Sequence, residues 1–388
     1  MYKSIFTLLV CILVNSFTIA QTLPPKQAYA LDVKQLHSGH SLTDPLFHPH
    51  WPGIYVNLIG HVNNTASWQL FDAMVGKSTA PGSSLMYRWN TPIGFGSPDA
   101  RQDIANWQLL CITERVPLLY EGGSNQQWYL DGIQEQRQYL SQFVNNAWLN
   151  GNNNMGTPTL LWTTWVNIDG SNGSFRQMLD IQGEEWERMQ DYANQHRPPG
   201  APPVYLIPGH KMMARLYDDI QNNLVPDITH ISQLFSDNIH INELGAYAMS
   251  MMHYACLFNT SPVGQPRDLL PGAPAGTPIP SQALATYMQQ MVWDIVTSYP
   301  RTGIYGNSLG INSPTIDQTL IVYPSPAQHK IQLLLQGKTP SKPFPYSIIH
   351  PTKGIIHKGL ATEIDISQLA IGYYFLQTPY GHKGFLKQ

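Results

Sequence analysis

A serine near the start of the chain and an aspartate–histidine pair much later have the residue types of a nucleophilic catalytic site. Ser41 lies in the segment His-Ser-Gly-His-Ser-Leu-Thr-Asp, residues 37–44, and Asp237 precedes His240 by three positions. A serine hydroxyl is a poor nucleophile until a base removes its proton, and a histidine oriented by a carboxylate can be that base. We therefore expect Ser41 to attack a carbonyl carbon, His240 to accept the proton and Asp237 to orient the imidazole.

Each half of this set also has a simpler structural interpretation. A Gly-x-Ser-Leu turn can occur without catalysis, and Asp237 can cap a helix that carries His240 in its first turn. The order and placement of the two segments favour catalysis. Residues 37–44 follow a predicted strand, and residues 236–245 precede a predicted apolar helix.

The elements that must position these side chains alternate short apolar runs with amphipathic stretches from about residue 28 to about residue 300. Such alternation is typical of strands and helices around a mainly parallel sheet, which binds ligands at the carboxyl ends of its strands. We therefore predict an α/β domain over residues 28–300. The predicted strands are residues 29–36, 107–113, 159–165 and 203–207, and the predicted helices are residues 134–149, 183–195, 210–223, 243–256 and 281–297.

Both segments resemble sequence blocks of the SGNH/GDSL hydrolase family, over roughly residues 30–256. The resemblance implies a three-layer, flavodoxin-like parallel sheet flanked by helices, with Ser41 as the nucleophile and Asp237 and His240 as its partners. His40 replaces the usual Asp of the family, a residue that is neither the nucleophile nor the base. The matching residues are Gly39, Ser41, Leu42 and Thr43 in the first block and Asp237, His240, Asn242 and Gly245 in the last.

The resemblance also implies an oxyanion hole, made by the N–H of the serine, a glycine and an asparagine that donate to the developing negative charge. Gly60 is the candidate glycine. The Gly-x-Asn-Asp segment of the family is missing, because the strand predicted over residues 107–113 ends in Thr-Glu-Arg, residues 113–115. Asn90 and Asn63 are the candidate replacements for the asparagine.

Several other polar or aromatic residues follow predicted strands. Thr113, Glu114 and Trp165 are candidates to bind the substrate. The structural interpretations are an ion pair between Glu114 and Arg115 and core packing of Trp165. His210 is expected at the surface, at the start of a helix.

The sequence lacks the motifs of metal, cofactor or nucleic-acid binding sites. The cluster of His37, His40, His48 and His50 lacks the paired cysteines or the His-Glu-x-x-His helix of zinc sites. Glycine-rich phosphate-binding motifs do not occur. Charged residues make up 12% of the chain and the formal net charge is −3, so the positive field that nucleic-acid binding needs is missing. We expect no metal, no cofactor and no nucleic-acid partner.

The amino-terminal segment has the pattern of a secretory signal over residues 1–20. Residues 5–14 form its apolar region, and Thr-Ile-Ala at residues 18–20 is a plausible cleavage site. Cys111 and Cys256 then either form one disulfide in an oxidising compartment or are two buried thiols, and the sequence does not decide between them. No later segment approaches the roughly 20 apolar residues that span a bilayer, so we expect no transmembrane segment.

The composition changes after the α/β domain. Residues 301–314 are predicted to be a linker, and residues 315–388 lack helical patterns and predict a small all-β sandwich. The predicted strands are residues 319–323, 330–335, 346–350, 354–357, 362–366 and 372–377.

This tail resembles the C-terminal sorting domain of the type IX secretion system. The resemblance rests on Val-Tyr-Pro-Ser-Pro-Ala at residues 322–327, Ile-Asp-Ile-Ser-Gln-Leu at 364–369 and Gly-Tyr-Tyr-Phe-Leu at 372–376. It implies export through the periplasm and outer membrane of a Gram-negative cell, to the surface or the medium, with the secretion machinery as a partner. A carbohydrate-binding or Ig-like accessory module is the alternative.

Together these patterns predict a secreted serine esterase that forms an acyl-enzyme. Export and the abundance of Tyr and Trp favour acyl groups on carbohydrate as the substrate, and a lipid ester is the rival substrate class. The alternative function is that of a secreted glycan-binding or surface protein that uses the same scaffold without catalysis.

Overall fold

The structure is a computed structural model of the chain. It describes residues 23–47, 52–93, 97–118, 126–305, 320–335, 338–340, 342–350, 354–378 and 381–388. The predicted signal segment and most of the predicted linker lie outside these ranges. Residues 301–305, which we expected in the linker, belong to the α/β region instead. Ile304 is buried in its core, and the Tyr305 hydroxyl donates to the Leu23 carbonyl at 2.6 Å.

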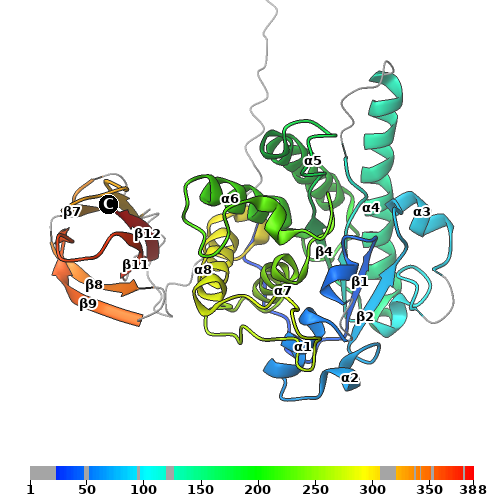
Figure 1. Cartoon of the computed structure of the whole chain (residues 1–388). Coiled ribbons are helices and arrows are strands. Elements are labelled where there is room, and N and C mark those ends of the chain that lie inside the picture. Colours follow the sequence, from blue (N-terminus) through cyan, green and yellow to red (C-terminus); the bar gives the residue numbers. More distant parts are fainter. Residues whose placement is uncertain are drawn as a thin grey trace, which may run out of the picture.

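Five parallel strands form the sheet of the α/β region, in the order β2-β1-β3-β4-β5 (Figure 1). This is the flavodoxin-like strand order of doubly wound sheets, so the predicted fold class is confirmed. Apolar side chains fill most of the positions in β3, β4 and β5, as expected for strands covered on both faces. The strands are β1 (Gln35–Gly39), β2 (Val75–Thr79), β3 (Leu109–Ile112), β4 (Thr159–Thr163) and β5 (Tyr205–Pro208).

Helices cover both faces of this sheet (Figure 1). Helix α1 connects β1 to β2 on one side of β1, and the later strands follow on the other side. Because the crossovers are right-handed, α1 therefore lies on one face of the sheet, and α4 and α5 lie on the other. Helix α7 packs against α1. The helices are α1 (Ile54–Val62), α2 (Ser67–Leu70), α3 (Leu85–Asn90), α4 (Gln126–Asn154), α5 (Phe175–His196), α6 (Gly209–Gln221), α7 (Glu243–Phe258) and α8 (Gln282–Ser298), with a 3-10 turn, η1 (Asp44–Leu46), after β1.

All five predicted helices and all four predicted strands of this region are present, with shifted ends. The predicted strand at residues 29–36 overlaps only the start of β1, which continues to Gly39. Strand β2 was not predicted, because Gly76, Lys77, Ser78 and Thr79 follow its one apolar residue. Helices α1, α2 and α3 were also not predicted. The missing β2 matters for the site, because the loop after it reaches the nucleophile segment.

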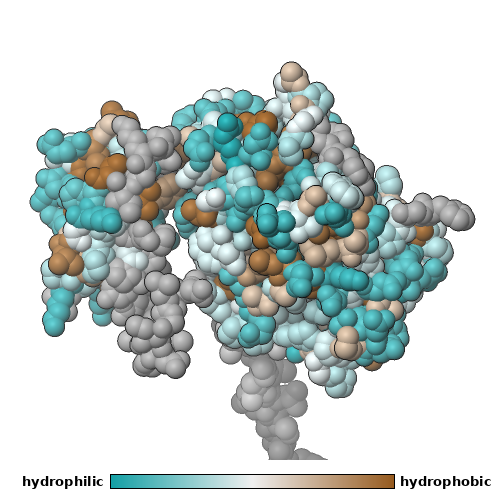
Figure 2. Space-filling model, turned by 90° about the horizontal axis from the view of Figure 1, so that it is seen from below, coloured by the Kyte–Doolittle hydropathy of each residue, from teal (hydrophilic) through white to brown (hydrophobic). Residues whose placement is uncertain are grey.

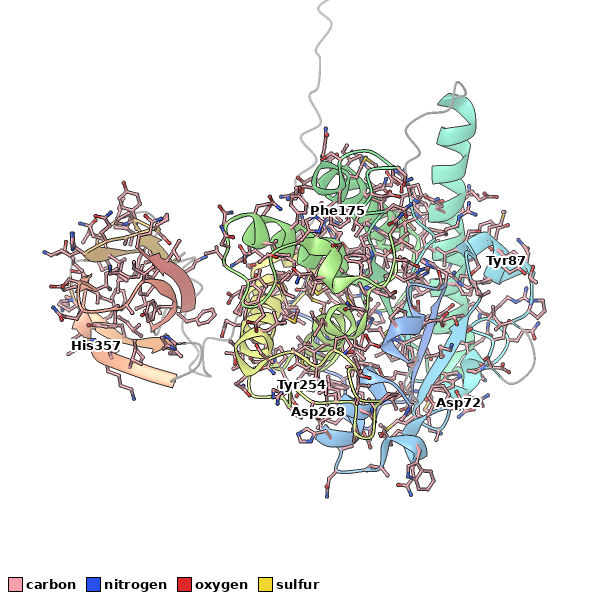
Figure 3. The ribbon with its side chains drawn as sticks, viewed as in Figure 1. Asp72, Tyr87, Phe175, Tyr254, Asp268 and His357 are labelled. Atoms are coloured by element: carbon pink, nitrogen blue, oxygen red, sulfur yellow. The ribbon has the colours of Figure 1, made fainter. Side chains whose placement is uncertain are left out.

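The C-terminal region is an antiparallel all-β sandwich, as predicted. Its two sheets have the orders β10-β7-β6 and β12-β11-β8-β9. Apolar side chains of both sheets share one core, which includes Ile331, Leu333, Ile348, Leu376 and Phe385 and is separate from that of the α/β region (Figure 3). The strands are β6 (Leu320–Tyr323), β7 (Lys330–Leu335), β8 (Phe344–His350), β9 (Gly354–Ala361), β10 (Glu363–Asp365), β11 (Gly372–Thr378) and β12 (Gly381–Lys387), the last of which was not predicted.

Two further predictions concern cysteines and membranes. Cys111, on β3, and Cys256, on α7, are buried free thiols, which answers the question that the sequence left open. Among the described residues, no helix has the length and apolar character needed to span a bilayer. On the face that Figure 2 displays, apolar residues form small patches between hydrophilic ones, as on most protein surfaces.

Candidate active site

Ser41 lies in a tight turn, residues 39–43, that follows β1 and is called the serine turn below. The Thr43 N–H donates to the His40 carbonyl at 2.8 Å, which closes the turn around Ser41. Leu42 is buried and anchors the turn, whereas Ser41 is only half-buried. A Cβ atom at Gly39 would lie 2.0 Å from the Thr43 hydroxyl oxygen, so this position requires glycine. Packing and turn geometry therefore account for the Gly-x-Ser-Leu-Thr pattern.

His40 joins the serine turn to the end of β3. Its Nε2 donates to the Glu114 carbonyl at 3.0 Å, and its Nδ1 accepts the Leu42 N–H at 3.4 Å. Burial lowers the pKa of His40 to about 4, and the positive charge of Arg88 acts in the same direction. His40 is therefore a neutral imidazole with its proton on Nε2, and it acts as a buried brace between two loops.

Asp237 and His240 form the hydrogen-bonded pair that the sequence predicts. The carboxylate Oδ2 of Asp237 lies 2.7 Å from His240 Nδ1. Its other oxygen accepts the N–H groups of Ile239 at 2.8 Å and His240 at 2.7 Å. Partial burial raises the pKa of Asp237, but these N–H groups and the imidazole outweigh that effect and hold the pKa below its ordinary value. An ionised Asp237 keeps the proton of neutral His240 on Nδ1 and leaves Nε2 free to accept another.

The segment that carries this pair, residues 236–242, is a closed loop, called the histidine loop below. The Ser236 N–H donates to the His240 carbonyl at 2.8 Å. The Asn242 side chain caps α7 by accepting the N–H groups of Leu244 at 3.0 Å and Gly245 at 3.3 Å. The alternative in which Asp237 caps the helix is therefore wrong, since Asn242 has that role.

Contacts with the end of β4 and with η1 place the histidine loop at the carboxyl edge of the sheet. The Trp165 indole N–H donates to the Ile239 carbonyl at 2.8 Å, and the Ile168 N–H donates to the Asn238 carbonyl at 2.8 Å. Helix α7, which follows the loop, packs against η1, which follows the serine turn. After burial and the charge of Arg88, protonation of His240 would also lower the pKa of His40. The two predicted halves of the site thus lie at the same edge of the sheet.

The structure does not bring Gly60 to the serine turn. Gly60 lies within α1, which begins beside η1 and ends at Val62. The next residue, Asn63, donates to the Leu31 carbonyl at 3.0 Å, upstream of β1. Gly60 therefore lies toward the opposite edge of the sheet, where it lines a groove of about 440 Å³ with residues 64–67 and 266–271.

The two candidate asparagines already use their amide groups. The Nδ2 of Asn90, at the end of α3, donates to the Met86 carbonyl at 3.0 Å and to the Tyr139 hydroxyl at 3.2 Å. The Nδ2 of Asn63 donates to the carbonyls of Leu31 and Ile59, both at 3.0 Å. Neither side chain has the arrangement expected of a donor held ready for an oxyanion.

Thr113, Glu114 and Trp165 are fully buried, so the prediction that their side chains contact the substrate is wrong. Trp165 supports the histidine loop instead. The carboxylate of Glu114 accepts the backbone N–H of Arg115 at 2.5 Å, and its main charged neighbour is Arg88, not Arg115 as the structural interpretation assumed.

His210 was expected at the surface, and this prediction is wrong as well. His210 stands at the start of α6 and is 1% exposed. Its Nδ1 lies 2.7 Å from the Thr163 hydroxyl oxygen, at the end of β4. Burial lowers its pKa to about 3. The residue is a neutral core histidine that joins the ends of two strands.

A loop that sequence reasoning missed contacts the serine turn directly. Residues 80–85, called the Gly82 loop below, follow β2 and end with Leu85, the first residue of α3. The Ala80 N–H donates to the Gly39 carbonyl at 3.2 Å, and the Ser83 hydroxyl donates to the same carbonyl at 3.4 Å. Gly82 has a φ of +65° and faces open space. The Pro-Gly-Ser-Ser sequence at residues 81–84 is the turn signal that would have indicated this loop.

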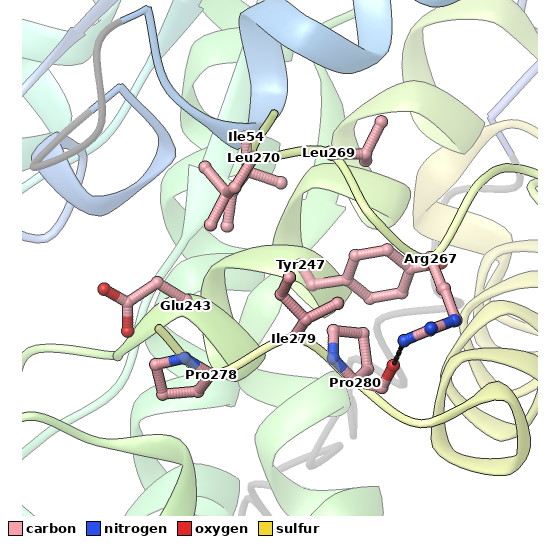
Figure 4. A pocket seen from close by; sticks show the side chains of 9 residues that line it. All are labelled: Ile54, Glu243, Tyr247, Arg267, Leu269, Leu270, Pro278, Ile279 and Pro280. Carbon is pink, nitrogen blue, oxygen red and sulfur yellow. Dashed lines mark hydrogen bonds between the residues drawn. The ribbon is translucent and has the colours of Figure 1, made fainter. Parts of the chain in front are cut away.

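A small pocket between the starts of α1 and α7 is lined by Ile54, Glu243 and Tyr247, together with residues of a long loop in which Arg267 donates to the Pro280 carbonyl at 3.0 Å (Figure 4). Its volume is about 10 Å³, close to the smallest space that holds one water molecule. The side chains of His240 and Asp237 are 33% and 55% accessible to solvent, so the histidine half of the candidate site is open to solvent.

No group of three or more His, Cys, Asp or Glu side chains is arranged to hold a metal ion within the part of the chain that the structure describes. His37 is buried on β1, where its ring packs edge-on against Phe47 and Tyr55. His48 and His50 lie outside the described residues.

Comparisons with known proteins find distant structural similarity only. No protein-family model matches the sequence. No curated protein matches it. A DUF4886 family protein from Bacteroides uniformis aligns over 69% of this chain and 96% of its own, with 14% identity and a TM-score of 0.46. A gut microbial diltiazem-metabolizing enzyme aligns over 61% of this chain and 49% of its own, with 16% identity and a TM-score of 0.40. A protein named as a GDSL-like lipase, from Parabacteroides merdae, aligns over 59% and 96%, with 14% identity and a TM-score of 0.35. Similarity at this level does not transfer a function to the present chain.

Proposed function

We propose that this protein is a serine esterase in which Ser41 is the nucleophile, His240 the general base and Asp237 the group that orients His240. The observation that carries the proposal is the 2.7 Å contact between Asp237 Oδ2 and His240 Nδ1, in a loop that is fastened to the same edge of the sheet as the serine turn. A histidine oriented in this way, with its other nitrogen free to accept a proton, is what activation of a serine hydroxyl requires.

The reaction follows from these roles. Ser41 Oγ attacks the ester carbonyl carbon while its proton passes to His240 Nε2. The tetrahedral intermediate collapses, the ester C–O bond breaks, and the leaving alkoxide takes the proton from His240. Water then attacks the acyl carbon and gives its proton to His240, which returns it to Ser41 as the acid leaves. Backbone N–H groups of Ser41 and of the Gly82 loop are the proposed donors to the oxyanion, in place of Gly60 and Asn90.

The proposed substrate is a small or polymeric ester, with acyl groups on carbohydrate as the preferred class. The exposure of His240 and Asp237 supports a substrate that extends beyond the reacting group. Exposed aromatic residues near the site offer surfaces on which a sugar ring can stack. Tyr87, on α3 directly after the Gly82 loop, is 49% exposed (Figure 3).

The esterase proposal is tested with p-nitrophenyl acetate and the Ser41→Ala variant. Loss of the nucleophile is expected to lower kcat by about 10⁴-fold or more, as in other serine hydrolases. Ser171→Ala, which changes an exposed serine after β4, is the matched control and should retain kcat. A fluorophosphonate should label the wild type at Ser41 and leave Ser41→Ala unlabelled. Absent turnover in the wild type, or equal turnover in Ser41→Ala, contradicts the proposal and favours a non-catalytic binding protein.

Export through the type IX secretion system is a separate proposal, supported by the sequence of residues 315–388. A variant that lacks these residues is expected to hydrolyse p-nitrophenyl acetate at the wild-type rate, because the sandwich has its own core and supplies none of the proposed catalytic residues. In a Gram-negative host that has this secretion system, the truncated protein should stay inside the cell. Normal export of the truncated form would contradict the sorting role.

A further inference from the structure

We propose that Arg88 and Glu114 are positioning residues, a buried pair that holds the Gly82 loop against the serine turn and thereby sets the rate of ester hydrolysis. The inference rests on the proposed function and extends it to two residues that touch neither the substrate nor the reacting atoms. It is carried by the hydrogen bonds of the two side chains, which connect the ends of β1, β2 and β3.

Glu114 links three segments of the site. Each of its carboxylate oxygens lies 3.1 Å from the Leu85 N–H, in the Gly82 loop. One of them also accepts the Arg115 N–H, which holds the chain just after β3. Its backbone carbonyl accepts the proton of His40 Nε2 at 3.0 Å, within the serine turn. A change at Glu114 therefore moves the loop and the turn together.

Arg88 makes the complementary set of contacts from α3. Its guanidinium donates to the Ser83 carbonyl at 2.9 Å and to the Ser83 hydroxyl at 3.0 Å. It also donates to the Thr113 carbonyl. Ser83 in turn donates to the Gly39 carbonyl at 3.4 Å. Arg88 thus reaches the serine turn through Ser83 and the end of β3 through Thr113.

Both members of the pair are removed from solvent. Glu114 is fully buried and Arg88 is 2% exposed. Burial raises the pKa of Glu114 to about 7 against the opposing charge of Arg88, and burial lowers the pKa of Arg88 to about 10 against the charge of Glu114. The hydrogen bonds of the two side chains go to backbone groups of neighbouring segments and to the Ser83 hydroxyl, and burying each charge costs desolvation energy. We therefore assign Arg88 and Glu114 the role of placing the backbone of these segments, and not that of stabilising the fold.

The pair also accounts for the missing asparagine block. Glu114 follows β3, where the SGNH/GDSL pattern has its Asn. Both side-chain oxygens of Glu114 accept backbone N–H groups and the side chain is fully buried, so Glu114 does not take the place of an amide donor in an oxyanion hole. Instead, Glu114 holds the Gly82 loop beside the serine turn. The backbone N–H groups of this loop are the proposed oxyanion donors.

The test replaces the whole pair, with Arg88→Met and Glu114→Gln in one protein, so that no unpaired charge remains buried. With p-nitrophenyl acetate, kcat is expected to fall by about tenfold or more, because misplacing oxyanion donors costs up to 10²–10³-fold. KM should stay within about twofold, since these donors act in the transition state. The control is Arg137→Met with Glu185→Gln, a pair 2.5 Å apart between α4 and α5, which should retain kcat.

A second variant keeps the test decisive if the double variant does not fold. Ser83→Ala removes the hydroxyl that links Arg88 to Gly39 and leaves Arg88 and Glu114 in place. Its kcat is expected to fall by about threefold or more at unchanged KM, on the same argument about donor placement. Wild-type kcat in a folded double variant, or in Ser83→Ala, overturns the positioning role. Failure of the proposed function is distinguished by Ser41→Ala, which would then be as active as the wild type.

Discussion

The histidine loop and the serine turn lie at the same edge of the sheet, but they are held in opposite ways. The histidine loop is exposed: the side chains of His240 and Asp237 are 33% and 55% accessible to solvent. It is also local, since Asp237 positions His240 through contacts within four consecutive residues. The serine turn is surrounded by buried polar groups from three other parts of the chain.

This difference separates two tasks of a catalytic site. A proton acceptor needs a fixed tautomer and access to the substrate, and both come from a short loop with one carboxylate. A nucleophile next to oxyanion donors needs several backbone segments at fixed distances, and only a packed interior supplies that. Substitutions in the histidine loop should therefore change activity without changing stability, whereas substitutions around the serine turn should change both.

The largest effect on the histidine side is expected from Asp237→Asn. The amide oxygen still accepts the N–H groups of Ile239 and His240, but the amide nitrogen donates to His240 Nδ1 and selects the tautomer with its proton on Nε2. His240 then has no free nitrogen for the Ser41 proton, and kcat should fall by about 10²–10⁴-fold. Steady-state kinetics and thermal melting of the purified variant are the measurements.

Asp169→Asn is the matched control for Asp237→Asn. Asp169 is an exposed carboxylate that accepts the Asn238 amide at 2.7 Å, next to the same loop. Its replacement should leave kcat within about twofold, because an exposed polar contact is worth little. Equal kcat in Asp237→Asn and the wild type would show that the loop geometry is not used in catalysis.

A change in pH is expected to have a smaller effect, on the stability of the fold, through the buried His40 of the serine turn. Burial lowers the pKa of His40 to about 4, whereas in the unfolded chain the value is near the ordinary 6.5. Between these values the unfolded state binds more protons, so acidification through this window destabilises the fold by about 1.4 kcal/mol per pH unit for each such histidine. Glu114 acts in the opposite sense, because its raised pKa favours the protonated folded state as the pH falls below 7.

The contribution of His40 is isolated by His40→Asn, which keeps one donor and one acceptor but does not titrate. Urea unfolding at pH values from 6 to 5 should show that the variant loses up to about 1.4 kcal/mol per pH unit less than the wild type. Identical slopes for the two proteins would mean that His40 is not held neutral in the fold. Such a result would remove the contrast between the two sides of the site.

The parts of the site that the sequence predicted are those whose contacts are short-range. Asp237, His240, Asn242 and Gly245 interact within one loop and the helix that follows it, so their spacing alone predicts their arrangement. Gly39 and Thr43 likewise form a turn whose pattern is visible in the sequence.

The remaining predictions failed because they depended on contacts between distant segments. Gly60 was the candidate glycine for the oxyanion hole, but it lies in helix α1, which runs away from the serine turn. Glu114 and Trp165 were assigned to the substrate because they follow strands, but their burial depends on loops that other strands supply. Arg88 belongs to no recognisable sequence motif. Only its contacts with Ser83 and Thr113 in the structure show that it lies beside the site.

By itself the sequence determined the α/β class with a mainly parallel sheet, the C-terminal sandwich and the pairing of Asp237 with His240. These follow from hydropathy periods and from contacts a few residues apart. The tertiary structure decided what surrounds Ser41: the Gly82 loop, the His40 brace and the buried Arg88–Glu114 pair. Burial of polar groups depends on which distant segments meet, and no local pattern encodes that.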